Sequence, residues 1–349
     1  MNIFVKTPLD GYNVLIKRSS LECDESYKDI PRSGKTLIVT DDGVPENYAK
    51  SVASHFSTPV TVTLPQGEQS KDLETYTFLL KTMCEHGFTR TDRAIAVGGG
   101  VIGDLCGFAA ATYMRGIGFY NFPTTFLADV DSSIGGKTAI DFCGIKNVVG
   151  AFYPPRKVII DTSVLETLPR RQLSAGIAES IKMAATSDKD LFSLLEIAAE
   201  GYSETFFTHA EEIIVKSLLI KKAVVETDPN EKGLRRVLNF GHTAGHAIES
   251  EYKGKLLHGE CVGLGMLPMC SPAVRARIEK LLLAYGLPVR AEVSEIEIAK
   301  LLRHDKKAVN DNEITSVHVN EIGNFRFRKE SAEEIAARSK DILCGGNAQ

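Results

Sequence analysis

The first half of the chain alternates short β-branched segments with helical patterns. Runs of about five residues, rich in Val, Ile and Thr and bounded by turn residues, are typical of buried strands at residues 36–40, 60–64, 93–97 and 157–161. Residues 72–86 place apolar side chains at helical spacing and stop before Gly87, a common helix C-terminal signal. Strand, helix and strand at this repeat length predict a parallel sheet with helices on both faces.

From about residue 168 the pattern becomes mainly helical. Helices are expected over residues 169–186, 190–200, 207–226, 243–252, 259–269, 273–285 and 294–303. Ser294 and Glu297 have the spacing of a capping box at the start of the last helix. One strand pair is expected at residues 315–319 and 324–328. We therefore predict an α/β N-terminal domain over residues 1–165 and a mainly α-helical C-terminal domain over residues 166–349, with the boundary somewhere in 160–170.

Composition narrows the class of protein. The 349 residues are 43% hydrophobic and 25% charged, which suits a soluble enzyme with two cores. A formal charge of −4 argues against a duplex-binding protein. No apolar run approaches the ~20 residues that span a bilayer, and the first residues lack a signal-peptide pattern. Seven scattered cysteines without a Cys-x-x-Cys pair indicate neither a disulfide scaffold nor a thiolate zinc site, so a reducing cytoplasm is expected.

A glycine cluster follows the strand at residues 93–97. Gly98, Gly99, Gly100 and Gly103 stand where this strand turns into a helix. Such a turn lets the backbone approach a pyrophosphate, and the helix N-terminus offers N–H groups to the anion. The order Gly-Gly-Gly-x-x-Gly-Asp differs from the standard dinucleotide fingerprint, so a plain tight turn is the alternative interpretation. Taken alone, the turn at residues 66–71 is more typical of a solvated loop, and the acid pair at 41–42 of a cap.

Three histidines gather in the second half. His242 and His246 are four residues apart, hence on one face of a helix, and His258 follows shortly after. Imidazoles on neighbouring helices with one carboxylate form the three-ligand zinc site that leaves a position open for substrate. Ordinary hydrogen-bonded histidines are the alternative. Spacing decides neither which histidines are ligands nor which carboxylate completes the site: Glu179, Glu249 and Glu260 all remain candidates.

Cationic side chains accompany these motifs. They stand in polar turns, beside Glu179 on a predicted helix, or upstream of the histidine helix: Lys137, Lys146, Lys182, Lys221 and Arg235. Any one of them alone is typical of a solvated surface charge. Several cations directed into one cleft would suit a substrate that bears both phosphate and carboxylate.

Taken together, these segments resemble the 3-dehydroquinate synthase family over about residues 34–327. The resemblance depends on residues 98–104, 111–116, 123–125, 131–147, 150–154, 178–182, 238–246 and 258–260. It implies an NAD-binding N-terminal domain with a Rossmann-like parallel sheet, a helical C-terminal domain and an active site in the cleft. The implied enzyme is a carbon–oxygen lyase of the shikimate pathway, and thus of aromatic amino acid biosynthesis. It converts 3-deoxy-D-arabino-heptulosonate 7-phosphate into 3-dehydroquinate and phosphate through transient oxidation by NAD, phosphate elimination, re-reduction, ring opening and aldol closure.

The resemblance also implies roles for individual residues. Zinc or cobalt would be bound by Glu179, His242 and His258. NAD would be bound by Asp41, Glu68, Lys71, Gly100, Val101, Ile102, Gly103, Asp104, Thr124, Thr125, Lys146, Val164, Leu165, Glu166 and Thr167. The catalytic and substrate-binding set would be Lys137, Lys182, Lys221, Arg235, Asn239, His246, Arg115, Asp131, Asn147 and Lys307, with Lys306 as the alternative to Lys307. Arg115 matches an arginine that the family lends from a partner subunit, which implies a homodimer.

Other functions remain in competition at this point. The 2-deoxy-scyllo-inosose and 2-epi-5-epi-valiolone synthases act on substrates without a carboxylate, so the cations at 182, 221 and 235 favour the shikimate substrate. A metal-dependent polyol dehydrogenase would release NADH. A catalytically inactive NAD-binding protein is disfavoured, because every expected polar position is present. The chain departs from the family pattern mainly at residues 227–230, at Ala244 and in the 272–285 helix.

Overall fold

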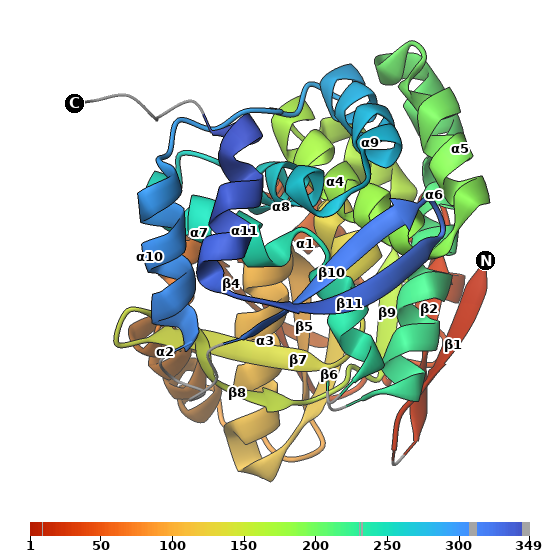
Figure 1. Cartoon of the computed structure of the whole chain (residues 1–349). Coiled ribbons are helices and arrows are strands. Elements are labelled where there is room, and N and C mark those ends of the chain that lie inside the picture. The colour runs from red at the N-terminus through yellow and green to blue at the C-terminus, as the bar shows by residue number, and fades with distance from the viewer. Residues whose placement is uncertain (9, 230, 232, 307–312, 344–349) are drawn as a thin grey trace. The chain divides into compact units, whose positions relative to one another are not determined.

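The computed structural model of the chain describes residues 1–8, 10–229, 231, 233–306 and 313–343. The chain forms two compact units, residues 1–168 and residues 169–349 (Figure 1). Among the described residues, the helices are all too short or too polar to cross a bilayer.

A seven-stranded sheet organises the first unit. Its order is β1 (Asn2–Lys6), β2 (Gly11–Ile16), β9 (Lys157–Ile160), β6 (Gly118–Pro123), β5 (Arg93–Gly98), β3 (Lys35–Asp41) and β4 (Thr58–Leu64). Every neighbouring pair is parallel except β1 and β2, which are antiparallel. The predicted parallel sheet is thus confirmed. The sequence analysis missed β2 and β6.

Helices cover both faces of this sheet. Leu37 and Val39 of β3 pack with side chains of α2 (Leu73–Glu85) and α3 (Gly100–Thr112). Ile38, between them, points to the opposite face and packs with α1 (Glu46–Ser54). Side chains alternate along a strand, so a central strand with helices on both sides must be apolar at successive positions. This explains why β3 and β5 are continuous apolar runs.

An antiparallel ribbon projects from the first unit where the sequence indicated only polar turns. It consists of β7 (Lys137–Phe142) and β8 (Ile145–Phe152), which pair with each other and not with the main sheet. Almost all of β8 is exposed, although it carries several apolar side chains. The glycines and lysines in this stretch concealed its strand character.

The second unit is mainly helical, as predicted. Its helices are α4 (Arg170–Ser187), α5 (Lys189–Ala199), α6 (Tyr202–Thr227), α7 (His242–Tyr252), α8 (His258–Met266), α9 (Pro272–Ala284), α10 (Glu295–Lys306) and α11 (Ala332–Ser339). The expected strand pair is β10 (Ile314–Glu321) and β11 (Asn324–Glu330). Helix α4 is buried almost along its whole length and packs against α5, α6 and α8. The sequence analysis did not predict α11.

One buried carboxyl group of the first unit has no compensating contact. Asp129 lies on the π-helical turn Ala128–Ser132 and is fully buried. Neither of its carboxylate oxygens has a hydrogen-bond partner. Burial raises the pKa of Asp129 well above its usual value, and the nearby charge of Asp161 raises it further. The folded protein therefore favours the protonated form of Asp129.

We predict that Asp129→Asn makes the protein more stable than the wild type at neutral pH, by about 1–3 kcal/mol. The unfolded chain loses this proton near the ordinary Asp pKa, whereas the folded chain retains it, so wild-type stability falls as pH rises above that value. Asn cannot ionise and has a similar size. Urea unfolding at several pH values between about 4 and 8 should show a gap that widens with pH. A gap that is constant across this range would contradict the assignment.

Candidate active site

The glycine turn of the first unit has the geometry of a nucleotide-binding loop. Strand β5 ends at Gly98 and helix α3 begins at Gly100. A Cβ at Gly98 would lie 2.8 Å from side-chain carbons of Ile102, so only glycine fits this turn. The N–H of Thr124 donates to the Gly98 carbonyl at 3.0 Å, which brings Thr124 and its neighbour Thr125 to the turn. The first N–H groups of α3 have no acceptor within the helix, so they could donate hydrogen bonds to an anion at this turn.

A cavity of about 700 Å³ opens beside the carboxyl end of β3. It is lined by residues 40–46 and by side chains of α1 and β4. Asp41 lies at its edge and accepts a hydrogen bond from the Gly43 N–H at 2.9 Å; burial raises the pKa of Asp41. The chain leaves β3 towards β4 and later returns to β5 on the other side of β3, so the topological switch point lies at the carboxyl ends of β3 and β5, whereas the cavity lies on the β4 side of β3. Open parallel sheets bind ligands at such points.

Several predicted residues of the first unit lie in contact. The Lys71 ammonium is 2.6 Å from a carboxylate oxygen of Asp104 and also contacts the Asn147 side-chain carbonyl. Lys71 is buried, and Glu68 lies in the short 3-10 turn just before it. The turn before α2, helix α3 and strand β8 therefore bring predicted NAD-binding and substrate-binding residues together.

The other predicted residues of this unit differ in how exposed their side chains are. Lys137, Lys146 and Arg115 are exposed, and Asp131 is partly buried. By contrast, Ile102, Val164 and Leu165 are buried in the core, so only their backbone groups could contact a ligand. The two residues after Leu165 make surface contacts: Glu166 pairs with Arg18 at 2.7 Å, and the Thr167 hydroxyl lies 2.8 Å from that of Tyr48.

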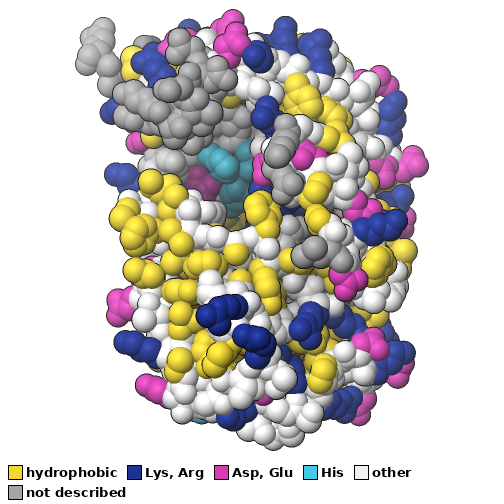
Figure 2. Space-filling model, turned by 90° about the horizontal axis from the view of Figure 1, so that it is seen from below, with side chains coloured by type: hydrophobic (Ala, Val, Ile, Leu, Met, Phe, Trp, Pro, Cys, Tyr) yellow, Lys and Arg dark blue, Asp and Glu magenta, His cyan; other side chains and the backbone are white. Residues whose placement is uncertain are grey.

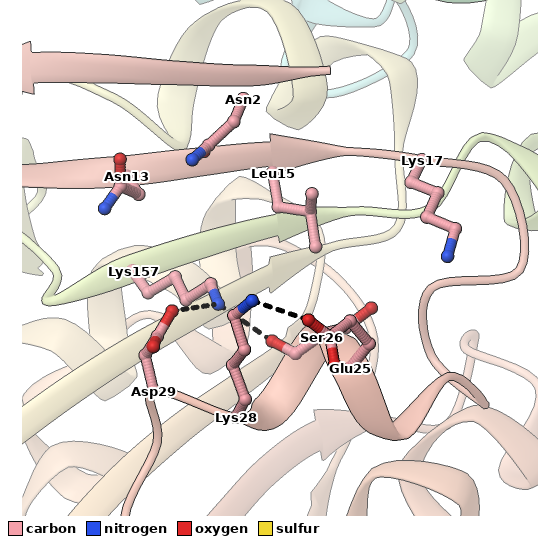
Figure 3. Close-up of a pocket in the computed structure, with 9 residues that line it drawn as sticks. All are labelled: Asn2, Asn13, Leu15, Lys17, Glu25, Ser26, Lys28, Asp29 and Lys157. Carbon is pink, nitrogen blue, oxygen red and sulfur yellow. Dashed lines mark hydrogen bonds and ion pairs between the residues drawn. The ribbon is translucent and has the colours of Figure 1, made fainter.

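A second cavity of the first unit is smaller, about 150 Å³, and lies beside β1 and β2 (Figure 3). Its cations already have partners. Lys157 donates to the Ser26 carbonyl at 2.9 Å and to Asp29 at 3.3 Å, and Lys28 pairs with Glu25. Lys157 is the first residue of β9, so this cavity lies beside the amino end of that strand. It contains none of the predicted site residues.

In the second unit, Glu179, His242 and His258 converge. Glu179 of α4 has only 1% of its side chain exposed, and its Oε1 atom lies 3.6 Å from His258 Nε2 and 3.9 Å from His242 Nε2. These distances are too long for hydrogen bonds, and Oε1 has no hydrogen-bond partner. Two ligand atoms about 2.1 Å from a tetrahedral ion lie about 3.4 Å apart. The donor set and its spacing therefore fit a zinc-type or cobalt-type cation.

His246 offers an alternative third ligand. One ligand atom from each of His242, His246 and His258 lies within 4.8 Å of the others. The ring centres of His242 and His246 are 5.1 Å apart. Two ligand sets thus share His242 and His258 and differ in whether Glu179 or His246 completes them. Figure 2 shows histidine side chains reaching the surface on one face of the chain.

Burial and neighbouring charges shift the pKa values of Glu179, His242 and His258. Burial alone would raise the pKa of Glu179, but the Lys182 ammonium, His258 and His242 together outweigh burial and hold that pKa well below the usual value. Burial and the charge of Lys182 lower the pKa of His242 to about 3. Burial also lowers the pKa of His258, but Glu179 and Glu249 outweigh it and raise the value to about 10. At neutral pH and without a cation, the cluster therefore holds an ionised Glu179, a neutral His242 imidazole and a protonated His258, whose Nε2 proton a bound cation would displace.

The sequence left Glu179, Glu249 and Glu260 as alternative metal ligands, and the structure shows that they make different contacts. Only Glu179 faces the Nε2 atoms of both histidines. Glu249 contacts the other side of His258, at Nδ1, over 3.1 Å. Glu260 accepts two hydrogen bonds of 2.7 Å from Arg171 and one from the N–H of Leu257, so it caps α8.

Three predicted cations of the second unit are buried. Lys182, Lys221 and Arg235 lie on α4, α6 and the 3-10 helix Leu234–Asn239, which pack together. Groups of the chain itself contact two of them: Lys182 pairs with Glu179, and Arg235 donates to the Pro229 carbonyl oxygen at 3.0 Å. The predicted residue Lys307 lies outside the described residues.

The sequence analysis missed Glu231 as part of this group. The Asn239 side-chain amide donates to Glu231 Oε1 at 3.3 Å. Glu231 adopts a left-handed backbone conformation with φ of 56°. It lies in the loop where the chain departs from the family pattern, and no motif marked it. Its contact with Asn239 becomes visible only in three dimensions.

The distance between Glu179 and His258 depends on Gly259, which has no side chain. Helix α8 begins at His258, and a Cβ on Gly259 would lie 1.8 Å from the Ala175 carbonyl oxygen of α4. Ala175 is one helical turn before Glu179. The absence of a side chain at Gly259 therefore allows α4 and α8 to approach closely enough for Glu179 and His258 to face one ion.

We predict that Gly259→Ala destabilises the protein by about 3 kcal/mol, near the upper end for overpacking, because the added methyl meets backbone. It should also weaken Co²⁺ binding, since α8 must move away from α4. Gly263→Ala on the same helix is the matched control, because its Cβ would meet only the Leu282 side chain at 3.1 Å. Chemical unfolding and cobalt titration of both variants provide the measurement. Equal effects of the two substitutions would contradict the prediction.

Solved structures with the same fold define the class of protein. A 2-deoxy-scyllo-inosose synthase complexed with carbaglucose-6-phosphate, NAD⁺ and Co²⁺ superposes with a TM-score of 0.88, at 26% identity, over 98% of this chain and 100% of that one. ValA, a 2-epi-5-epi-valiolone synthase from Streptomyces hygroscopicus with NAD⁺ and Zn²⁺ bound, gives 0.84 at 26% identity, over 95% and 96%. Glycerol dehydrogenase from Schizosaccharomyces pombe shares the fold alone, with a TM-score of 0.65 at 18% identity over 94% and 88%. The fold is therefore that of the sugar-phosphate cyclases.

Sequence relatives identify the family within this class. Residues 61–175 match the 3-dehydroquinate synthase N-terminal model, and residues 176–308 match the C-terminal model. The 3-dehydroquinate synthase of Streptococcus sanguinis is 39% identical over 96% of this chain and 98% of its own length. That of Enterococcus faecalis is 39% identical over 97% and 98%. The chain belongs to the 3-dehydroquinate synthase family, which confirms the resemblance and the fold class.

Proposed function

We propose that the protein converts 3-deoxy-D-arabino-heptulosonate 7-phosphate into 3-dehydroquinate and phosphate, as a carbon–oxygen lyase with NAD and one divalent cation. The observation that carries the proposal is the convergence of Glu179, His242 and His258 in a chain that belongs to this family along nearly its whole length. The cysteine pattern is compatible with action in the cytoplasm.

Within the second unit, Glu179, His242 and His258 would hold the cation, which is zinc or cobalt. In the first unit, the N–H groups at the start of α3 would bind the pyrophosphate of NAD, while Asp41 would accept hydrogen bonds from a ribose. When bound, NAD would supply a temporary hydride acceptor, and the cation would supply a Lewis acid for the hydroxyl that is oxidised. The other residues bind and orient the substrate.

The polar residues have separate tasks in this proposal. Lys137 and Asn147 of the first unit, and Asn239 and His246 of the second, would bind the substrate phosphate. Lys182, Lys221 and Arg235 would hold the carboxylate and the hydroxyls. Burial of these three cations supports this assignment, because a charge-assisted hydrogen bond is stronger where water is excluded.

A homodimer is also proposed, with Arg115 reaching the site of a second copy of the chain. Met114 and Arg115 both have positive φ angles, 52° and 64°, which is costly for residues other than glycine. Strand β8 exposes Ile145, Val148 and Phe152 by 58%, 51% and 60%. Figure 2 shows apolar side chains gathered on one face of the chain. Such a patch is typical of a protein–protein interface.

Incubation with the heptulosonate phosphate, NAD and Co²⁺ or Zn²⁺ tests the proposed reaction. Phosphate and a product with the mass of 3-dehydroquinate should appear together without net NADH, because the hydride returns within one turnover. Accumulation of NADH would instead indicate a dehydrogenase. Turnover only of a sugar phosphate without a carboxylate would indicate another cyclase.

The two ligand sets predict different behaviour of two histidine variants. His242→Ala should abolish Co²⁺ binding, whereas His246→Ala should retain it and slow phosphate elimination by about 10²-fold or more, the usual effect of losing a group that assists proton transfer. Glu179→Gln should lose the metal like His242→Ala. Metal content of the purified variants and phosphate release provide the measurement. Equal loss of metal in both histidine variants would favour the all-histidine set and contradict this assignment.

A further inference from the structure

Glu249 stands behind one of the proposed ligands. It lies seven residues after His242 on α7, so both side chains project from the same face of the helix. Glu249 Oε2 is 3.1 Å from His258 Nδ1, and 18% of the Glu249 side chain is exposed. The Nε2 atom of the same ring is directed to Glu179 at 3.6 Å. The imidazole of His258 is thus held between two carboxylates.

This contact determines which nitrogen of His258 is available. An ionised carboxylate can only accept a hydrogen bond, so Nδ1 must carry the proton and donate it to Glu249. When a cation displaces the second proton of the ring, the lone pair is therefore on Nε2, which faces Glu179. His242 is oriented in the same way, because its Nδ1 lies 3.3 Å from the Phe240 carbonyl oxygen. Of these two anchors, only the one at His258 is charged.

We propose that Glu249 is a positioning residue of the metal centre, which holds the ring and tautomer of His258 and thereby strengthens divalent-cation binding. The inference depends on the proposed function only for the identity of the ligands. Carboxylates that accept the second N–H of a ligand histidine typically contribute about 10- to 100-fold in metal affinity. Glu249 is not itself a ligand in this arrangement, because it contacts the Nδ1 side of the ring, whereas Glu179 faces Nε2.

A purely structural role is the alternative. The Glu249 contact also links the last turns of α7 to the first residue of α8, across a connection in which Lys253 and Gly254 adopt left-handed conformations. Loss of this link alone would lower stability. It would leave the ring nitrogens of His258 and the ligand field of a bound ion unchanged.

Titration of the metal-stripped full-length protein with Co²⁺ distinguishes these roles. Glu249→Ala should bind Co²⁺ about 10- to 100-fold more weakly than the wild type, with a shifted cobalt absorption spectrum. Glu249→Gln should recover part of the affinity, since its amide oxygen still accepts the Nδ1 proton without the charge. Glu251→Ala, an exposed glutamate two residues further along, is the matched control and should bind like the wild type. Urea unfolding of each variant verifies that it is folded.

The tautomer of His258 gives a second readout that stability alone does not change. In nitrogen-15 spectra of histidine-labelled protein loaded with Zn²⁺, Nδ1 of His258 should carry the proton in the wild type. In Glu249→Ala, where no carboxylate holds that proton, a share of the rings should bind the ion through Nδ1 and carry the proton on Nε2. An affinity within twofold of the wild type, together with an unchanged tautomer, would overturn the inference.

His258→Ala separates failure of the inference from failure of the proposed metal centre. If His258→Ala binds Co²⁺ normally, the proposed ligand set is wrong. If His258→Ala loses the metal and Glu249→Ala does not, only the inference fails. The double variant should bind no more weakly than His258→Ala, because Glu249 acts through that ring.

Discussion

The arrangement of the second unit depends on one buried carboxylate. An ionised Glu179 with 1% of its side chain exposed is unfavourable unless other groups compensate the charge. Lys182 compensates one oxygen from the next turn of the same helix, and the other oxygen faces the Nε2 atoms of two histidines. A cation among these three groups would complete the compensation. The close approach of α4 and α8 at Gly259 follows from the same requirement, because Glu179 is too short to reach His258 otherwise.

Local sequence patterns predicted strands rich in β-branched residues and helices with regular apolar spacing. Strands β3 and β5 are covered on both faces, and their continuous apolar runs were recognised. Strand β6 is equally buried but contains Asn121 and three aromatic residues, which obscured it. The β7–β8 ribbon was missed because its stability depends on cross-strand pairing, while its glycines and lysines indicated turns. Helix α3 begins at Gly100, inside the glycine cluster, since these glycines belong to the helix as well as to the turn.

The chemistry of the site was predictable as a set of residue types, but not as a set of roles. Spacing along α7 brought His242 and His246 to one face and suggested a metal. It could not distinguish Glu179, which comes from a helix far away in the sequence, from Glu249 on the same helix. Their roles depend on which imidazole nitrogen each one faces, and that is a property of helix packing. For the same reason, Glu231 carried no signal until its contact with Asn239 was visible.

In both units a buried lysine forms an ion pair with a carboxylate. Lys71 is buried against Asp104 beside the glycine turn, as Lys182 is buried against Glu179 beside the histidines. Each pair holds a charged group in place before any ligand arrives. A polar site that is already oriented stabilises the charges that develop in a reaction without reorganising first. Loss of one partner of such a pair therefore affects more than the missing contact, because it leaves the other charge buried and free to reorient.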